Sequence, residues 1–134
     1  MLYTPGLEQL DPALLAFVKC HVTSPLKWEA LRVLASRNGA WVRAAELAHM
    51  THKEPHDLAP AMAELAAEGV IEVSLSRSGE PEEVLYRLEA QDPTSIVAHR
   101  LIEAATHSQE LRAIIAAYLA QTRKGSLRAP SAIA

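Results

Sequence analysis

Aromatic residues make up only 4% of this 134-residue chain, and cysteine occurs once, at Cys20. The core must therefore be built from aliphatic side chains, because apolar residues still account for 49% of the chain. A single cysteine excludes an intrachain disulfide, which agrees with a reducing, cytoplasmic environment. The length suits one domain around one hydrophobic core.

Long apolar runs are lacking as well. No run approaches the roughly 18–20 residues that a membrane-spanning helix needs, and the first residues, MLYTPGLEQLD, lack the basic and apolar segments of a secretion signal. We therefore expect a cytoplasmic protein with no membrane partner. The sequence also has no glycine-rich phosphate loop, no G-x-S-x-G and no H-E-x-x-H motif, which predicts neither an enzyme nor a cofactor.

Positive charge is absent from one long stretch of the middle of the chain. Between Lys53 and Arg77 there is no lysine or arginine, whereas five acidic residues lie there. Residues 44–92 hold three basic and eleven acidic residues, a net charge of −8, while residues 1–43 carry +2 and residues 93–134 carry +3. Such asymmetry indicates an interaction surface, although an ordinary solvated surface explains it equally well.

Three helix-start signals divide the chain. Asp11-Pro12, Ser24-Pro25 and Asp92-Pro93 each place a capping side chain before a proline, which suits the first position of a helix. We expect the first helix to end near His21 and the second at Asn38-Gly39. The third begins an apolar stripe that ends at Lys124-Gly125, before a mobile tail. A weak capping signal at Thr106 or Ser108 leaves open whether residues 93–124 form one helix or two.

Residues 46–88 combine two periodicities. Five apolar residues at helical spacing predict two helices joined by a tight turn: Leu47, Ala48, Leu58, Met62 and Leu65. Gly69 then permits the chain to leave the second helix and enter a strand. Because an interior proline is costly, Pro60 favours a second helix that is capped by Asp57 and spans residues 58–68, with residues 52–56 as a loop. Alternating apolar residues then predict a half-buried hairpin: Ile71, Val73, Leu75, Val84, Tyr86 and Leu88. Residues 40–42 are predicted to form a short edge strand.

On these positions the segment 24–89 resembles the winged helix-turn-helix superfamily, without pointing to one subfamily. The resemblance implies a mainly α fold with a small β-hairpin wing, in a transcription-regulator-like protein. We divide the chain into an N-terminal arm and helix (1–23), the winged helix-turn-helix domain (24–89), a C-terminal helical dimerisation segment (90–124) and a flexible tail (125–134). The apolar stripe exceeds what one small domain can cover, which predicts a homodimer through Ile96, Leu101, Leu111, Ile115, Tyr118 and Leu119.

The presumed recognition helix exposes alanine, proline and acid, which give little to read base edges with. If the protein binds double-stranded DNA, we expect the flanking cations Arg43, Lys53 and Arg77 to make the contacts. The alternative is a protein-interaction module whose acidic face, at Asp57, Glu64, Glu80, Glu82 and Glu83, docks a basic protein partner. No metal site is predicted, because His49, His52 and His56 are weak candidates on a segment that Pro55 interrupts.

Overall fold

We describe the fold from a computed structural model, which describes residues 6–76, 83–89 and 91–133, for residues 8, 76 and 122–133 by their backbone alone. In chain order it contains a 3-10 turn and six helices, with three short strands between them. The elements are η1 (Leu7–Gln9), α1 (Pro12–His21), α2 (Pro25–Ser36), β1 (Val42–Arg43), α3 (Ala44–Thr51), α4 (Pro55–Ala67), β2 (Glu72–Ser76), β3 (Glu83–Arg87), α5 (Pro93–His107) and α6 (Gln109–Ile133).

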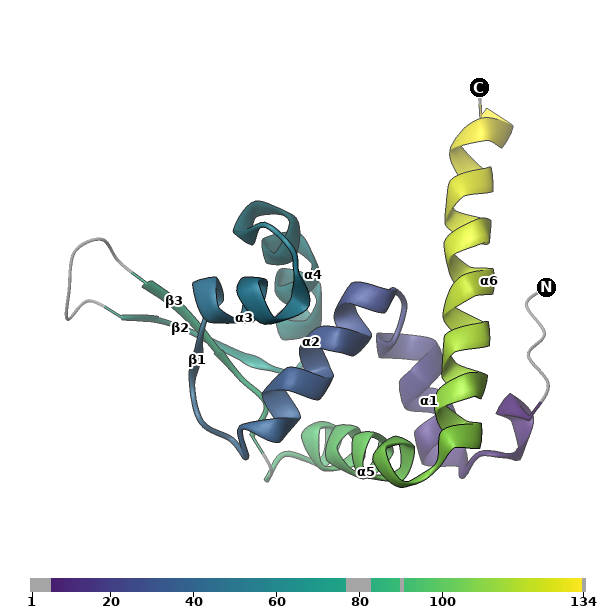
Figure 1. The fold of residues 1–134 in the computed structure, drawn as a ribbon, viewed down its shortest axis with the longest axis horizontal. Helices are drawn as coiled ribbons and strands as arrows, with labels where there is room; N and C mark the ends of the chain where they lie inside the picture. The colour runs from purple at the N-terminus through teal and green to yellow at the C-terminus, as the bar shows by residue number, and fades with distance from the viewer. Residues whose placement is uncertain (1–5, 77–82, 90, 134) are drawn as a thin grey trace.

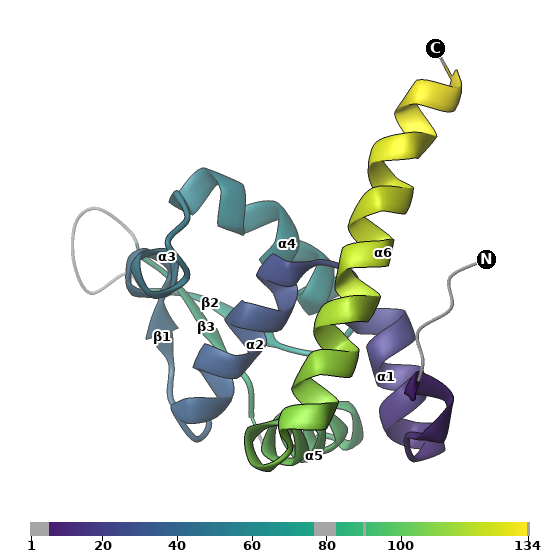
Figure 2. The same cartoon turned by 45° about the vertical axis from the view of Figure 1, so that its right-hand side comes forward.

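Helix α2 lies at the centre, in contact with α3, α4 and α5 (Figure 1). The small sheet has the order β1-β3-β2 and is antiparallel throughout, with Val42 and Val73 both opposite Tyr86. Leu31 of α2, Leu47 of α3 and Leu101 of α5 are fully buried in one continuous core. Helix α5 runs beneath this body, and α6 rises from its end so that its second half stands clear of the other elements in both views (Figures 1 and 2).

The three predicted helix starts are confirmed at Pro12, Pro25 and Pro93, although the side chain of Asp92 makes no capping bond. Asp11 accepts a hydrogen bond from the backbone N–H of Ala13, and Ser24 accepts one from that of Lys27. The C-terminal segment is two helices, because Ser108 leaves helical geometry and its hydroxyl accepts a bond of 3.0 Å from the backbone N–H of Leu111. Helix α6 continues to Ile133, past the predicted end at Gly125. A glycine inside a helix costs only about 1 kcal/mol, so it need not stop one.

The predicted start of the second motif helix is wrong by one turn. Helix α4 begins at Pro55, with Glu54 at the N-cap position but without a side-chain capping bond, so Asp57 lies inside its first turn and Pro60 in its interior. The carbonyl of Glu54 accepts bonds from the N–H groups of Asp57 and Leu58, at 3.0 and 3.1 Å. Pro55 is itself well suited to the first helical position. The early start adds a turn, at the cost of the hydrogen bond that Pro60 cannot donate.

The predicted hairpin is present, but its apolar side is covered unevenly. Val73 and Leu75 lie on the apolar side of the alternation, yet they are 45% and 52% exposed. Both residues lie on the same face of the sheet as the buried Tyr86. Helix α3 contacts β1 and β3, so this face is covered over those two strands and is open over the outer strand β2. The alternation of apolar residues gives the side of the strand, whereas a third element decides whether that side is covered.

Candidate nucleic-acid interface

Helices α3 and α4 are joined by a three-residue turn, residues 52–54, that a left-handed histidine makes possible. His52 has φ 58° and ψ 39°, and the backbone N–H of Lys53 donates to the carbonyl of Ala48 at 2.9 Å. This closing bond of a helix C-terminus usually needs glycine, and a histidine there carries a steric cost. Across the turn, the fully buried Leu47 and Met62 fix the two helices against the core.

The outward face of α4 offers few groups that could read a base. Its exposed residues include Asp57, Ala59, Pro60 and Ala63, as the sequence predicts. His56 is the exception: the earlier start of α4 moves it from the predicted loop onto the first helical turn, where its side chain is 79% exposed and lies 3.5 Å from Asp57. An imidazole can donate or accept a hydrogen bond. The sequence-based prediction missed His56 as a helix residue because it placed the N-cap at Asp57, one residue after it.

Glu64, in the second half of α4, and Glu68, directly after its end, both contact the body of the protein. Lys27 of α2 donates to Glu64 at 2.6 Å and to the hydroxyl of Thr23 at 2.8 Å. The ring of His21 on α1 lies 2.9 Å from Glu68 through Nδ1. Glu64 was predicted to be a docking residue, yet its carboxylate anchors α4 to α2. The ammonium of Lys27 therefore offsets part of the negative charge that the sequence assigns to this helix.

The predicted DNA-contact residues lie at the edges of the helix pair. Lys53 is exposed in the turn before α4 and has no ion pair among the described residues. Arg43, at the end of β1, is exposed and lies 3.7 Å from Glu83, so a predicted contact and a predicted docking residue face each other. Arg77, Glu80 and Glu82 fall outside the residues that the structure describes.

The residues predicted to form a dimer are mostly inside a single chain. Leu101, Leu111, Ile115, Tyr118 and Leu119 are buried in the core of one copy, and Ile96 is exposed. Between Gln109 and Gln121, the part of α6 whose side chains are described, four of the seven exposed residues are alanine, at positions 113, 116, 117 and 120. In the described part of the chain, no group of three histidine, cysteine or acidic side chains could hold a metal ion, so the structure does not bring His49, His52 and His56 together.

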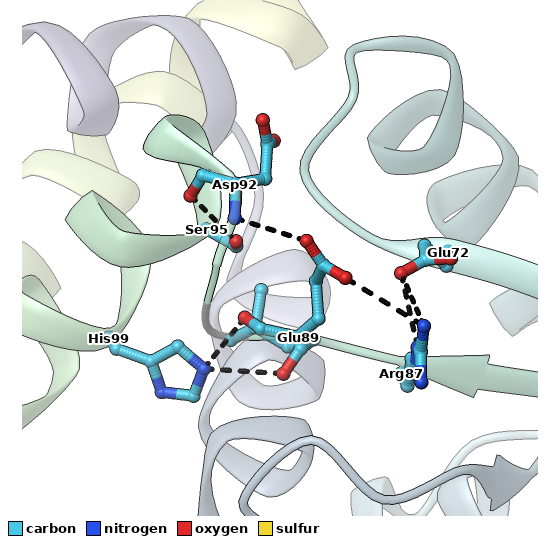
Figure 3. Close-up of polar contacts among 7 residues, drawn as sticks. Glu72, Arg87, Glu89, Asp92, Ser95 and His99 are labelled. Atoms are coloured by element: carbon cyan, nitrogen blue, oxygen red, sulfur yellow. Dashed lines mark hydrogen bonds and ion pairs between the residues drawn. The ribbon is translucent and has the colours of Figure 1, made fainter.

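A polar network joins the wing to α5 (Figure 3). Arg87 of β3 pairs with Glu72 at 2.9 Å and with Glu89 at 3.7 Å, and its guanidinium stacks 4.6 Å above the ring of Trp41. Glu89 also accepts a 3.0 Å bond from the backbone N–H of Asp92, where α5 starts. His99 of α5 contacts the carbonyls of Leu88 and Glu89 through Nε2, at 3.2 and 3.0 Å. None of these residues was among the site residues predicted from the sequence.

A central helix, a helix-turn-helix pair and a hairpin packed on a short third strand define a winged helix-turn-helix fold, which confirms the predicted fold class. No protein-family model and no curated protein matches the sequence. No helix among the described residues is long and apolar enough to span a membrane.

Solved structures do share the fold. A MarR-family transcriptional regulator from Silicibacter pomeroyi superposes with a TM-score of 0.52 at 18% identity, over 90% of this chain and 77% of that one. The antimony-specific transcriptional repressor AntR superposes with a TM-score of 0.51 at 18% identity, over 79% of this chain and 91% of that one. NadR, solved in complex with 4-hydroxyphenylacetate, superposes with a TM-score of 0.55 at 16% identity, over 96% of this chain and 86% of that one. Likeness at this level of identity is likeness of fold.

Proposed function

We propose that this chain is a small homodimeric transcription regulator that acts in the cytoplasm and binds duplex DNA through cations flanking α4. The observation that carries this proposal is the position of Lys53, which is exposed in the turn that leads directly into α4. In a helix-turn-helix the start of the second helix is the part that meets the duplex.

The start of α4 suits a phosphate better than a base. Pro55 has no N–H, and that of Asp57 is bonded to the carbonyl of Glu54. The backbone N–H of His56 is therefore the first-turn donor that the helix start can offer an anion, because Glu54 makes no side-chain capping bond. Lys53 and the exposed His56 lie on either side of this terminus. Asp57 and Glu54 oppose the attraction, so we expect binding that is weak, largely independent of sequence and sensitive to salt.

Dimerisation is supported by the C-terminal helices. In both views α6 extends beyond the body of a single copy (Figures 1 and 2). Its exposed alanines allow another helix to approach closely, and the exposed Ile96 adds apolar area on α5. A two-fold contact between such helices would set two copies of α4 at a fixed spacing, as binding to two half-sites requires. A monomeric mass by light scattering at tens of micromolar would exclude this part of the proposal.

The second candidate function is a protein-interaction module that docks a basic protein partner on the same face. One observation favours it: no lysine or arginine lies on α4, whose outward face carries Asp57 among alanine and proline. Under this alternative, Asp57 and Glu83 remain available as docking residues, together with Glu80 and Glu82, whereas Glu64 is engaged by Lys27.

Fluorescence anisotropy with a labelled random duplex separates the two candidates. We expect binding at about 50 mM salt that weakens steeply as salt rises. The double variant Lys53→Ala and Arg77→Ala should lower the slope of log K against log salt by about two, one for each lost phosphate contact. Arg100→Ala, an exposed cation on α5 that lies 3.9 Å from Asp11, is the matched control and should leave the slope unchanged. No binding at the lowest salt would overturn the DNA proposal.

A further inference from the structure

A cavity of about 480 Å³ opens between α2 and α5, on a different surface from the outward face of α4. One wall is the second half of α2, and the other is the α5 face that carries His99, Ile102, Glu103 and Thr106. It therefore lies between two helices that belong to different parts of the molecule, the winged domain and the C-terminal segment.

The charges on these walls do not cancel. Arg32 and Glu29 both line the cavity, and they pair with each other at 3.2 Å. Glu103 has no hydrogen bond or ion pair with any residue in the part of the chain that is described. One carboxylate is thus left uncompensated, and the cavity has a net charge of −1 with histidine neutral.

His99 adds a second acceptor beside this carboxylate. Its Nε2 contacts two backbone carbonyls, which can only accept, so Nε2 carries the proton. In the neutral ring, Nδ1 is then an acceptor, and it lies on the side of the ring away from those carbonyls (Figure 3). Glu103 follows His99 by four residues, so the two side chains lie on one face of α5. Together they suit a group that is positively charged and carries N–H donors.

The remaining walls determine what the rest of the ligand must be. Val33 and Ile102 line the cavity from opposite helices, and Ile102 is largely buried. A fully hydrated inorganic cation would leave these side chains unused, whereas an apolar body would cover them. The geometry points to an amphipathic organic amine, and we propose that the α2–α5 cavity binds this class of ligand, its ammonium on Glu103 and His99 and its apolar body on Val33 and Ile102.

His99 also connects this cavity to the wing. The ring that would bind the ammonium through Nδ1 holds the carbonyls of Leu88 and Glu89 through Nε2, and Glu89 in turn contacts Arg87 (Figure 3). A ligand that shifts this ring would therefore shift the backbone of Leu88 and Glu89, directly after β3. This regulatory consequence rests on the proposed DNA-binding function, whereas amine binding does not.

An NMR titration of the isotope-labelled full chain tests the site, with phenethylamine as the probe and phenylacetate as its counterpart of opposite charge. A probe of this size should bind in the millimolar range. We expect the amine to shift the resonances of Val33, His99 and Ile102, and phenylacetate to leave them unchanged. Glu103→Gln should raise the Kd about fivefold, as expected for a partly exposed charge pair. The matched control is Glu110→Gln, an exposed acid on α6 outside the cavity, which should leave the Kd unchanged.

Three results would overturn the site: no shift at these residues with the amine, equal binding of phenylacetate, or an unchanged Kd in Glu103→Gln. The duplex anisotropy measurement, repeated with saturating phenethylamine, tests the regulatory step by itself. Unchanged duplex affinity would remove that step. Complete absence of duplex binding would overturn the proposed function, while the NMR result would still decide whether the cavity binds amines.

Discussion

Replacing Glu64 by glutamine should destabilise the protein, although Glu64 lies mostly at the surface. Its partner Lys27 is only 5% exposed, whereas the Glu64 side chain is 62% exposed. The change therefore leaves an almost buried ammonium with no counter-charge, because the amide oxygen of glutamine and the hydroxyl of Thr23 can accept its hydrogen bonds but carry no net charge. Exposed ion pairs contribute about 0.2–1 kcal/mol, and removing one partner of a fully buried pair costs about 3–5 kcal/mol. For a pair with one buried end we expect a loss of about 2 kcal/mol.

Urea unfolding of four proteins measures this effect: the parent, Glu64→Gln, Lys27→Met and the double variant. Lys27→Met should cost little, because it leaves Glu64 in contact with water. The double variant should then recover most of the stability that Glu64→Gln loses. Glu29→Gln is the control, since Glu29 and Arg32 form a pair with both ends about half exposed. A buried, uncompensated ammonium is refuted if Glu64→Gln loses no more free energy of unfolding than this control, or if the double variant is no more stable than Glu64→Gln.

Three further predictions concern the frame around the site. Gly6→Ala should cost about 1–2 kcal/mol in urea unfolding, because Gly6 has φ +87° and an added Cβ would lie 2.8 Å from Ile114 Cδ1; Gly39→Ala, at φ +86° in open space, should cost less. Ser108→Ala should cost about 1 kcal/mol through the lost cap of α6, seen as a lower Tm; an unchanged Tm would contradict that role. Burial raises the pKa of Tyr86 above its ordinary value of 10.0. The contribution of the neutral Tyr86 side chain to the free energy of unfolding is therefore complete below pH 10 and is lost as the pH rises through the raised pKa, because the unfolded chain ionises first. Tyr86→Phe should reduce the alkaline loss of stability, and identical pH profiles would refute this.

Local signals explain which parts of the fold were predictable. A capping side chain followed by proline acts within one turn, so the starts of α1, α2 and α5 could be predicted from two residues each. The start of α4 could not be fixed in this way, because Pro55 and Pro60 demand different starts. The structure satisfies Pro55 at the first helical position and accepts the missing bond at Pro60.

Non-local contacts explain most of what the sequence did not reveal about the site. Lys27 and Glu64 are separated by 37 positions, and His21 and Glu68 by 47, so no spacing rule pairs them. Without those pairs the acids of α4 are predicted to be a uniform acidic face. The network around His99 likewise depends on backbone carbonyls, which every residue type carries, so residue identity gave no signal for it.

The outer position of β2 has a consequence for handling the protein. Its free edge offers backbone N–H and C=O groups without strand partners in the described sheet, and Val73 and Leu75 beside them are exposed. An open edge with apolar side chains is the usual starting point for strand pairing between molecules. As concentration rises, aggregation of the proposed dimers should therefore begin at this strand, and Leu75→Lys should reduce it without disturbing the core.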